Sequence, residues 1–220
     1  MASGPSFGPP PPPAPAARSS NRGWYIATAV VAVLVIGVVS ILLATSGGGG
    51  GGSGGEADCS STDADSKGFT ECMRQLAGAV VDHNDCSTGA KNPLGGDAIE
   101  TPGATTASCS MADDYTAMYM HFDKDDDAKT YMDAIKQQFK SLGGTTGSSD
   151  PEEGDWSADG MAGTYYSIDL GYGNGVLVFQ VNDSPVAGVL MHISTDPSAG
   201  ATKMTDYFDK HVKPGSDGGA

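Results

Sequence analysis

An uncharged run of 22 residues, Trp24 to Thr45, places the strongest constraint on how this chain can fold. As an α-helix this run would extend about 33 Å, slightly more than the hydrocarbon core of a bilayer at about 30 Å. Trp24 and Tyr25 begin the run, and aromatic rings favour the interface between lipid headgroups and acyl chains. We therefore expect a transmembrane helix over residues 24–45, through which the chain contacts the lipid bilayer.

Basic residues near this segment predict its orientation. Arg18 and Arg22 lie just before it, and the next basic residue along the chain is Lys67. Positive charge favours the cytoplasmic side, so the N-terminus is expected in the cytoplasm and the C-terminal domain outside the cell. A cleaved signal peptide would have a shorter apolar region, a short basic start and a small-residue cleavage site. This run is longer and follows 23 residues of tail, which favours an uncleaved, single-pass anchor in the cell membrane.

Low-complexity segments flank the predicted helix. Residues 1–23 contain an unbroken proline run, Pro9 to Pro13, which favours a polyproline II rod and offers no apolar surface for packing. We expect this cytoplasmic tail to be disordered, although proline-rich segments can also dock in aromatic grooves. Residues 46–55 read SGGGGGGSGG, which predicts a flexible linker between the membrane and the outer domain.

Acidic residues are confined to the part of the chain after the linker. All 27 Asp and Glu lie beyond Gly55, together with 10 of the 12 Lys and Arg, so this part carries a net charge of −17. Such a surface repels nucleic-acid phosphates and anionic lipid headgroups, so we expect neither of them as a partner. The same charge would also keep an exposed domain soluble.

The pattern of residues 56–215 predicts one extracytoplasmic α+β domain. We expect helices that open at Thr70, at Asp125 and after Asp196-Pro197. Their buried stripes are Phe69, Cys72, Met73, Leu76 and Val80, then Tyr131, Ile135, Phe139 and Leu142, then Met204, Phe208 and Val212. The expected strands are residues 104–110, 116–122, 163–170, 175–181 and 186–194.

These elements predict an antiparallel sheet of about five strands, with the three helices packed mainly on one face. Residues 145–159 are expected to form a polar loop, and its acidic run, Asp150, Glu152, Glu153 and Asp155, to be solvated. Residues 216–220 are expected to be a disordered C-terminus.

Four cysteines, Cys59, Cys72, Cys86 and Cys109, all lie beyond the predicted membrane segment. An even number of cysteines in an oxidising compartment indicates two disulfides, with three possible pairings. Two pairs of free, buried thiols are an alternative. A metal site is disfavoured because the spacings contain no C-x-x-C element.

Several short motifs of the outer domain resemble a known arrangement. They are Asp85-Cys86, Ala107-Ser108-Cys109, Tyr119 to Asp123 with the helix through Ala128 and Met132, and the Tyr165-Tyr166 strand. The arrangement is similar to the extracytoplasmic domains of actinobacterial membrane proteins, including those fused to receptor-like serine/threonine kinases, over roughly residues 75–213. The resemblance implies an exported sensory or interaction domain with Cys86 bridged to Cys109. This sequence departs from the kinases in lacking a cytoplasmic catalytic domain, so the resemblance leaves signalling to the interior open.

The positions of the cysteines agree with that bridge. Cys86 follows the first predicted helix, Cys109 lies in the first predicted strand, and the loop between them is rich in Gly, Pro and Thr. Closing this loop would stabilise the fold by about 3 kcal/mol through the entropy of the unfolded chain. We then expect Cys59 to pair with Cys72, which would tie the end of the linker to the first helix. The crossed pairings stay open, although they draw the linker across the core.

No motif of the outer domain indicates a catalytic, cofactor or metal site. Asp123 to Asp127 resembles the start of a calcium loop, but Ala128 and Ala134 stand where that loop needs Gly and Glu, and helix N-capping explains the run better. The four histidines, His83, His121, His192 and His211, show no H-x-x-x-H spacing, and no G-x-S-x-G motif is present. His121 and His192 fall in predicted strands, where hydrogen-bonded sheet histidines are expected.

We therefore expect a non-enzymatic, membrane-anchored binding or sensor module at the cell surface, without a cofactor, whose partner is an envelope protein or another ligand. One alternative is a cell-envelope hydrolase that uses carboxylates such as Asp169 and Glu153. A cleft with two converging buried carboxylates would favour the hydrolase. Another alternative is a structural envelope protein that acts through its proline-rich tail.

Overall fold

The computed structural model describes residues 59–89, 103–142, 149–171, 173–194 and 203–219. The expected tail, transmembrane helix and linker, residues 1–55, lie outside these ranges, as does the expected helix cap at Asp196-Pro197. Within the described ranges, no helix has both the length and the apolar character needed to cross a bilayer.

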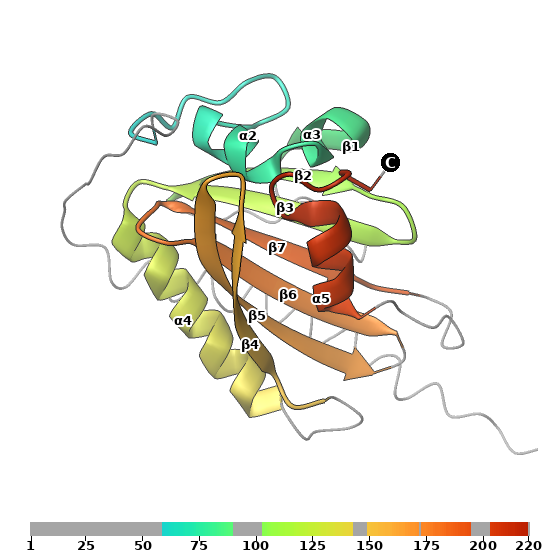
Figure 1. Cartoon of the computed structure of the whole chain (residues 1–220). Helices are drawn as coiled ribbons and strands as arrows, with labels where there is room; N and C mark the ends of the chain where they lie inside the picture. The colour runs from blue at the N-terminus through green and yellow to red at the C-terminus, as the bar shows by residue number, and fades with distance from the viewer. Residues whose placement is uncertain (1–58, 90–102, 143–148, 172, 195–202, 220) are drawn as a thin grey trace, which may run out of the picture.

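An antiparallel sheet of seven strands forms the centre of the domain, in the order β1-β2-β3-β7-β6-β5-β4 (Figure 1). The strands are β1 Asp85–Thr88, β2 Ala104–Ser110, β3 Tyr115–Phe122, β4 Glu152–Ala158, β5 Met161–Gly171, β6 Asn174–Val181 and β7 Val186–His192. The α+β class expected from the sequence is confirmed, but the sheet has seven strands instead of about five.

The two strands that the sequence pattern missed, β1 and β4, are the outermost strands of the sheet. β1 has four residues, DCST, of which Cys86 is the buried one. β4 falls within the expected polar loop of residues 145–159, and Trp156 is its only buried residue. Short or charged edge strands discourage pairing with other chains, and this same composition makes them look like loops.

Helices cover both faces of the sheet (Figure 1). One face, here called the α2 face, carries α2 (Glu71–Ala77), α3 (Val80–His83), α5 (Met204–Tyr207) and the π-helical η1 (Phe208–Val212). The opposite face, here called the α4 face, carries α4 (Asp125–Leu142). The expectation that all three helices pack mainly on one face is therefore wrong for α4. The physical reason is that β7 is buried along its whole length, so both of its sides need a cover.

The expected helix starts and buried stripes are largely present. Thr70 is the N-cap of α2, and its side-chain oxygen accepts a hydrogen bond from the amide of Met73 at 3.2 Å. α4 begins at Asp125 with three Asp in its first turn, where negative charge is favourable against the helix dipole. The expected stripe of the last helix is buried, although the helix begins at Met204 and continues as η1.

Aromatic rings on the α2 face lie across glycines of the neighbouring strand. The cross-strand pairs are Trp156 with Gly163, Tyr165 with Gly154, and Phe179 with Gly188. Phe208 of η1 packs against the three rings, at centroid distances of 6.2, 6.3 and 4.9 Å respectively. The glycines leave the space that these rings fill, so the sheet and η1 meet closely.

The chain continues to pack after η1, over residues for which the sequence predicts disorder. The backbone carbonyl of Asp217 accepts a hydrogen bond from His83, and its carboxylate lies 2.5 Å from Nδ1 of His211. The carbonyl of Gly218 accepts from the side chain of Asn84 at 2.6 Å. Residues 216–219 are thereby fastened to α3 and to η1.

Candidate functional site

All four cysteines are paired, as Cys59–Cys72 and Cys86–Cys109. These are the two expected pairs. Cys86–Cys109 joins residues that lie directly opposite each other in β1 and β2, and Cys59–Cys72 joins the start of the described chain to α2. Two disulfides favour an oxidising compartment, and they leave no thiol free to act as a nucleophile or a metal ligand.

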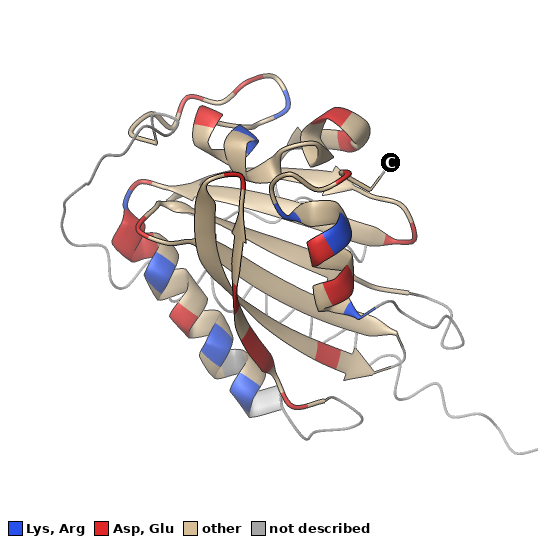
Figure 2. Ribbon diagram, in the orientation of Figure 1, with Lys and Arg blue, Asp and Glu red and all other residues tan. Residues whose placement is uncertain are grey.

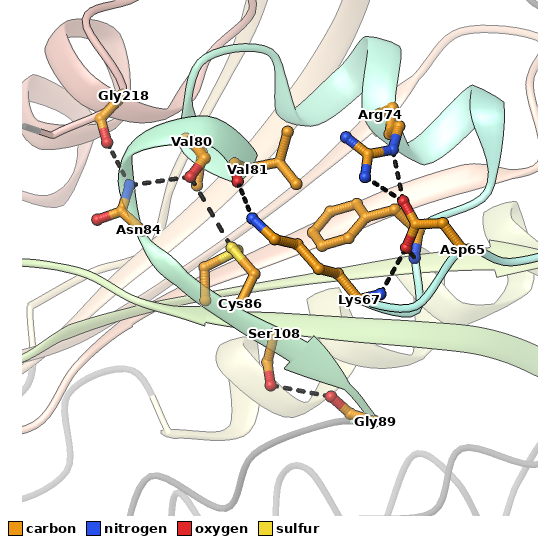
Figure 3. Close-up of a disulfide and its surroundings, with 12 residues drawn as sticks. Asp65, Lys67, Arg74, Val80, Val81, Asn84, Cys86, Gly89, Ser108 and Gly218 are labelled. Carbon is orange, nitrogen blue, oxygen red and sulfur yellow. Dashed lines mark hydrogen bonds and ion pairs between the residues drawn. A yellow bond between two sulfur atoms is a disulfide. The ribbon is translucent and has the colours of Figure 1, made fainter.

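The surroundings of Cys86–Cys109 are built for stability (Figure 3). The carbonyl of Val80 faces the sulfur of Cys86 at 3.8 Å and also accepts a hydrogen bond from Asn84 at 3.0 Å. Lys67 donates to the carbonyl of Val81 at 2.8 Å. These contacts and the disulfide hold α3 on the sheet.

The histidines are dispersed, and each makes a hydrogen bond within the protein. His121 and His192 are buried in β3 and β7, as expected, and His192 contacts the carbonyl of Gly173 through Nδ1. His83 and His211 meet at Asp217 near the C-terminus. Within the described part of the chain, no group of three or more His, Cys, Asp or Glu is placed to hold a metal ion.

The carboxylates named for a hydrolase do not converge. Glu153 lies opposite Tyr166, on the α4 face, where it pairs with Lys136 of α4 at 2.5 Å. Asp169 is exposed, and the alternation of β5 directs it to the α2 face. Two carboxylates on opposite faces of a sheet cannot act on one glycosidic bond.

The acidic run that resembles a calcium loop in the sequence forms the first turn of α4. Asp125, Asp126 and Asp127 occupy the first turn of α4. Partial burial raises the pKa of Asp125 above its usual value, and the carboxylates of Asp126 and Asp183 raise it further. The dipole of α4 favours these negative charges at its first turn.

The second acidic run, expected in a loop, instead lies along β4, the last strand of the sheet (Figure 2). Consecutive side chains of a strand point to opposite faces, so Glu152 and Glu153 flank the strand on its two sides. Glu152 forms an ion pair with Lys203 at 2.9 Å, ahead of α5, and Glu153 forms one with Lys136 of α4. Among the described residues, β4 pairs with β5 alone, so its outer backbone groups form an edge.

Tyr165 brings an aromatic ring to this edge. The ring lies across Gly154 of β4, where an added Cβ would come 2.5 Å from the tyrosine hydroxyl oxygen. Partial burial raises the pKa of Tyr165, and Glu152, Asp209 and Asp155 raise it further by placing negative charge nearby. Tyr165 is part-exposed, and Glu152 and Asp209 lie on the same α2 face as its ring, whereas the alternation of β4 directs Asp155 to the α4 face.

We call Glu152, Tyr165 and Asp209, with the outer edge of β4, the β4 edge site. An aromatic face and carboxylates together attract Lys and Arg side chains, through cation–π and charge-assisted contacts. Sequence reasoning missed this site because it assigned the β4 residues to a loop. The signal that could have identified it is the buried Trp156 within the alternating acidic stretch EEGDWSA.

Comparison with protein-family models finds no match, and no curated protein or solved structure matches the chain. The similarity to actinobacterial extracytoplasmic domains therefore stays a prediction. Function has to be inferred from the geometry of the β4 edge site.

Proposed function

We propose that this protein is a membrane-anchored extracytoplasmic binding module without an enzymatic role, and that it takes a basic, extended segment of another protein along β4. The observation that carries this proposal is the β4 edge site. An extended peptide can add a strand to an open sheet edge, where backbone hydrogen bonds give affinity and side-chain contacts give specificity. The uncharged run at residues 24–45 supports the anchor, and the two disulfides support an extracytoplasmic domain.

The negative charge of β4 favours a basic partner over a second copy of this chain. β4 carries Glu152, Glu153 and Asp155 within four residues. A second copy of this strand would bring like charges opposite one another, which disfavours a homodimer at this edge. Lys and Arg at alternate positions of an incoming strand would instead face the carboxylates and the ring of Tyr165.

The test uses the full-length protein in nanodiscs of uncharged phosphatidylcholine, titrated calorimetrically with two nine-residue peptides. One peptide alternates Lys with Val and the other alternates Glu with Val. We expect the Lys peptide to bind, with an affinity that falls as salt is added, and the Glu peptide not to bind. Equal affinity for both peptides, or no binding of the Lys peptide, would contradict the proposal.

Variants then locate the contact. Glu152→Gln and Asp209→Asn should each weaken binding of the Lys peptide by about two- to fivefold, as expected for rim charges. Asp169→Asn is the matched control, because Asp169 is also an exposed carboxylate but lies on β5, outside the β4 edge site. An Asp169→Asn variant that binds as weakly as the other two would indicate general charge attraction and not a site.

A further inference from the structure

A buried histidine joins the N-terminal end of the described chain to the sheet. His121 lies in β3 and is 1% exposed. Its Nε2 is 3.0 Å from the carbonyl oxygen of Cys59, and its Nδ1 is 2.8 Å from the hydroxyl oxygen of Thr70. The ring therefore connects three segments: the entry of the chain, the N-cap of α2 and the third strand.

The partners determine which nitrogen carries the proton. A carbonyl oxygen only accepts, so Nε2 must donate its hydrogen to Cys59. In the neutral ring Nδ1 then has no hydrogen and accepts one from the hydroxyl of Thr70. The oxygen of Thr70 in turn accepts from the amide of Met73 at 3.2 Å. Every group in this chain of hydrogen bonds is satisfied while His121 is neutral.

The contacts of His121 lie near both ends of the loop that the Cys59–Cys72 disulfide closes. Cys59 is joined to Cys72, two residues after Thr70, so the ring touches the segment of residues 59–72 near both of its ends. His121 and the disulfide thus restrain the same segment, one by contact and the other by covalent closure. Three residues, 56–58, separate this segment from the predicted linker of residues 46–55.

We propose that His121 is an acid-sensitive latch, whose protonation releases the segment of residues 59–72 from β3 and exposes the Cys59–Cys72 disulfide to solvent. A protonated ring would carry a hydrogen on Nδ1 as well, and this hydrogen would have to be donated to the oxygen of Thr70. That oxygen already accepts from Met73, and the hydroxyl of Thr70 would lose His121 as its acceptor. The protonated ring would also place a charge at a position that is 1% exposed, which is unfavourable.

Burial of the ring favours the neutral form. It opposes the hydrogen bond to Cys59 and the carboxylate of Asp123, which lies just after β3, and both of these raise the pKa of His121. Burial outweighs both and lowers the pKa below its usual value. The strands on either side place Thr105 and Val186 opposite the ring, and neither of these titrates.

The sign of the pH dependence follows from this lowered pKa. The unfolded or released histidine binds its proton more readily than the latched one, so the latch is fully closed above the usual value of about 6.5. Its stabilisation is lost as pH falls from there through the lowered value. Between these two values the released population should rise about tenfold for each pH unit.

The test measures how fast each disulfide is reduced in the full-length protein in nanodiscs. The protein is treated with a phosphine reductant at pH 7.5 and at pH 5.0, alkylated, and mapped by mass spectrometry. We expect reduction of Cys59–Cys72 to accelerate severalfold at the lower pH, relative to Cys86–Cys109 in the same sample, with about thirtyfold as the upper limit set by the fall from about 6.5 to 5.0. Cys86–Cys109 corrects for any effect of pH on the reductant. Equal acceleration of both disulfides, or none, would overturn the proposal.

His121→Gln separates the latch from general acid sensitivity. A glutamine amide can accept from Thr70 and donate to Cys59 as the neutral ring does, but it cannot be protonated in this range. The variant should keep slow reduction at pH 7.5 and lose the acceleration at pH 5.0. His211→Gln, which changes the part-exposed histidine at Asp217, is the matched control and should keep the acceleration.

A measurement on the unaltered protein covers the case in which His121→Gln fails to fold. Nitrogen NMR of the imidazole rings should show His121 protonated on Nε2 at neutral pH, and a titration midpoint below that of an exposed histidine. A His121 with hydrogen on Nδ1, or with an ordinary midpoint, would overturn the latch.

Discussion

The α2 face and the α4 face of the same sheet are held in different ways. On the α4 face, one helix of 18 residues presents a stripe of buried side chains, which are Ala128, Tyr131, Met132, Ile135 and Phe139. On the α2 face, the described cover consists of helical segments of seven, four, four and five residues. Segments that short do not form stable helices by themselves, so they depend on their contacts with the sheet.

Cross-links and aromatic contacts are concentrated on the α2 face. Both disulfides belong to it, and Phe208 packs against three aromatic rings there. Tyr115 also stacks on Tyr207 at a centroid distance of 3.4 Å. On the α4 face, by contrast, the rings meet in simple pairs such as Phe122 with Tyr131 at 5.6 Å. The comparison indicates that a face covered by short helices needs covalent and aromatic support, whereas one long amphipathic helix does not.

The largest expected effect comes from removing the cross-strand disulfide of the α2 face. Cys86→Ala combined with Cys109→Ala should lower the free energy of unfolding by about 3 kcal/mol, because the bridge closes a loop with a sequence separation of 23. Urea unfolding monitored by circular dichroism measures the change. A loss below about 1 kcal/mol would show that packing alone holds β1 and α3.

The α4 face supplies the control for that experiment. Ile135→Val removes one buried methylene from the side of α4 that packs on the sheet. It should lower the free energy of unfolding by about 1 kcal/mol. If the two faces are held independently, this cost should be the same with and without the disulfide, within about 0.5 kcal/mol. A larger coupling would show that the cross-link also supports α4 through the sheet.

The sequence predicts the α4 face better than the α2 face, because the signals for α4 are local. Asp125 marks its start, and its buried stripe recurs at helical spacing through Phe139. The disulfide pairing could also be predicted, since Cys86 and Cys109 flank a loop with little to pack. Which face a helix covers could not be predicted, because the stripes of α2 and α4 are alike in one sequence.

The β4 edge site is the part that sequence reasoning could not predict. Its residues come from β4, β5 and η1, which are distant along the chain, and no local pattern indicates that they meet. Glu152, Glu153 and Asp155 favour a loop by composition. Trp156 is buried only because Phe208 lies at the other end of the sequence to cover it, a contact that depends on the complete fold.

Gly188→Ala tests whether the aromatic rings of the α2 face need glycine on the neighbouring strand. We expect its effect on stability to lie between those of the disulfide and of the Glu153–Lys136 ion pair. An added Cβ would come 2.1 Å from the ring of Phe179, which is fully buried and has no free space to enter. The overpacking should cost about 1–3 kcal/mol in the free energy of unfolding. Ala187→Gly is the control, since Ala187 is the preceding residue of β7 and lies in the core of the α4 face.

Ala187→Gly should lower the free energy of unfolding by about 1 kcal/mol or less, because glycine gives the unfolded backbone more freedom. Thermal or urea unfolding of both variants gives the comparison. If Gly188→Ala were neutral, the aromatic packing on the α2 face would be looser than the structure shows, and the contrast between the faces would lose its basis.

The smallest expected effect concerns the ion pair that ties β4 to α4. Glu153 and Lys136 are 54% and 23% exposed, so solvent screens most of their attraction. Glu153→Gln should therefore lower the free energy of unfolding by a few tenths of a kcal/mol at most, and high salt should remove the difference. The hydrogen bond from Lys136 lowers the pKa of Glu153, so the contribution is complete above the usual value of 4.5 and is lost as pH falls through the lowered one.

This small effect bears on whether the edge is available to a partner. Urea unfolding of the Glu153→Gln variant at pH 7 and at pH 3 should show a slight difference from the unaltered protein at pH 7 and none at pH 3. Such a result would mean that Trp156, packed against Phe208, holds β4 in place and that its carboxylates are free to exchange partners. A loss of 2 kcal/mol or more would instead show that the carboxylates of β4 are committed to the fold. An incoming basic strand would then have to break structural ion pairs in order to bind.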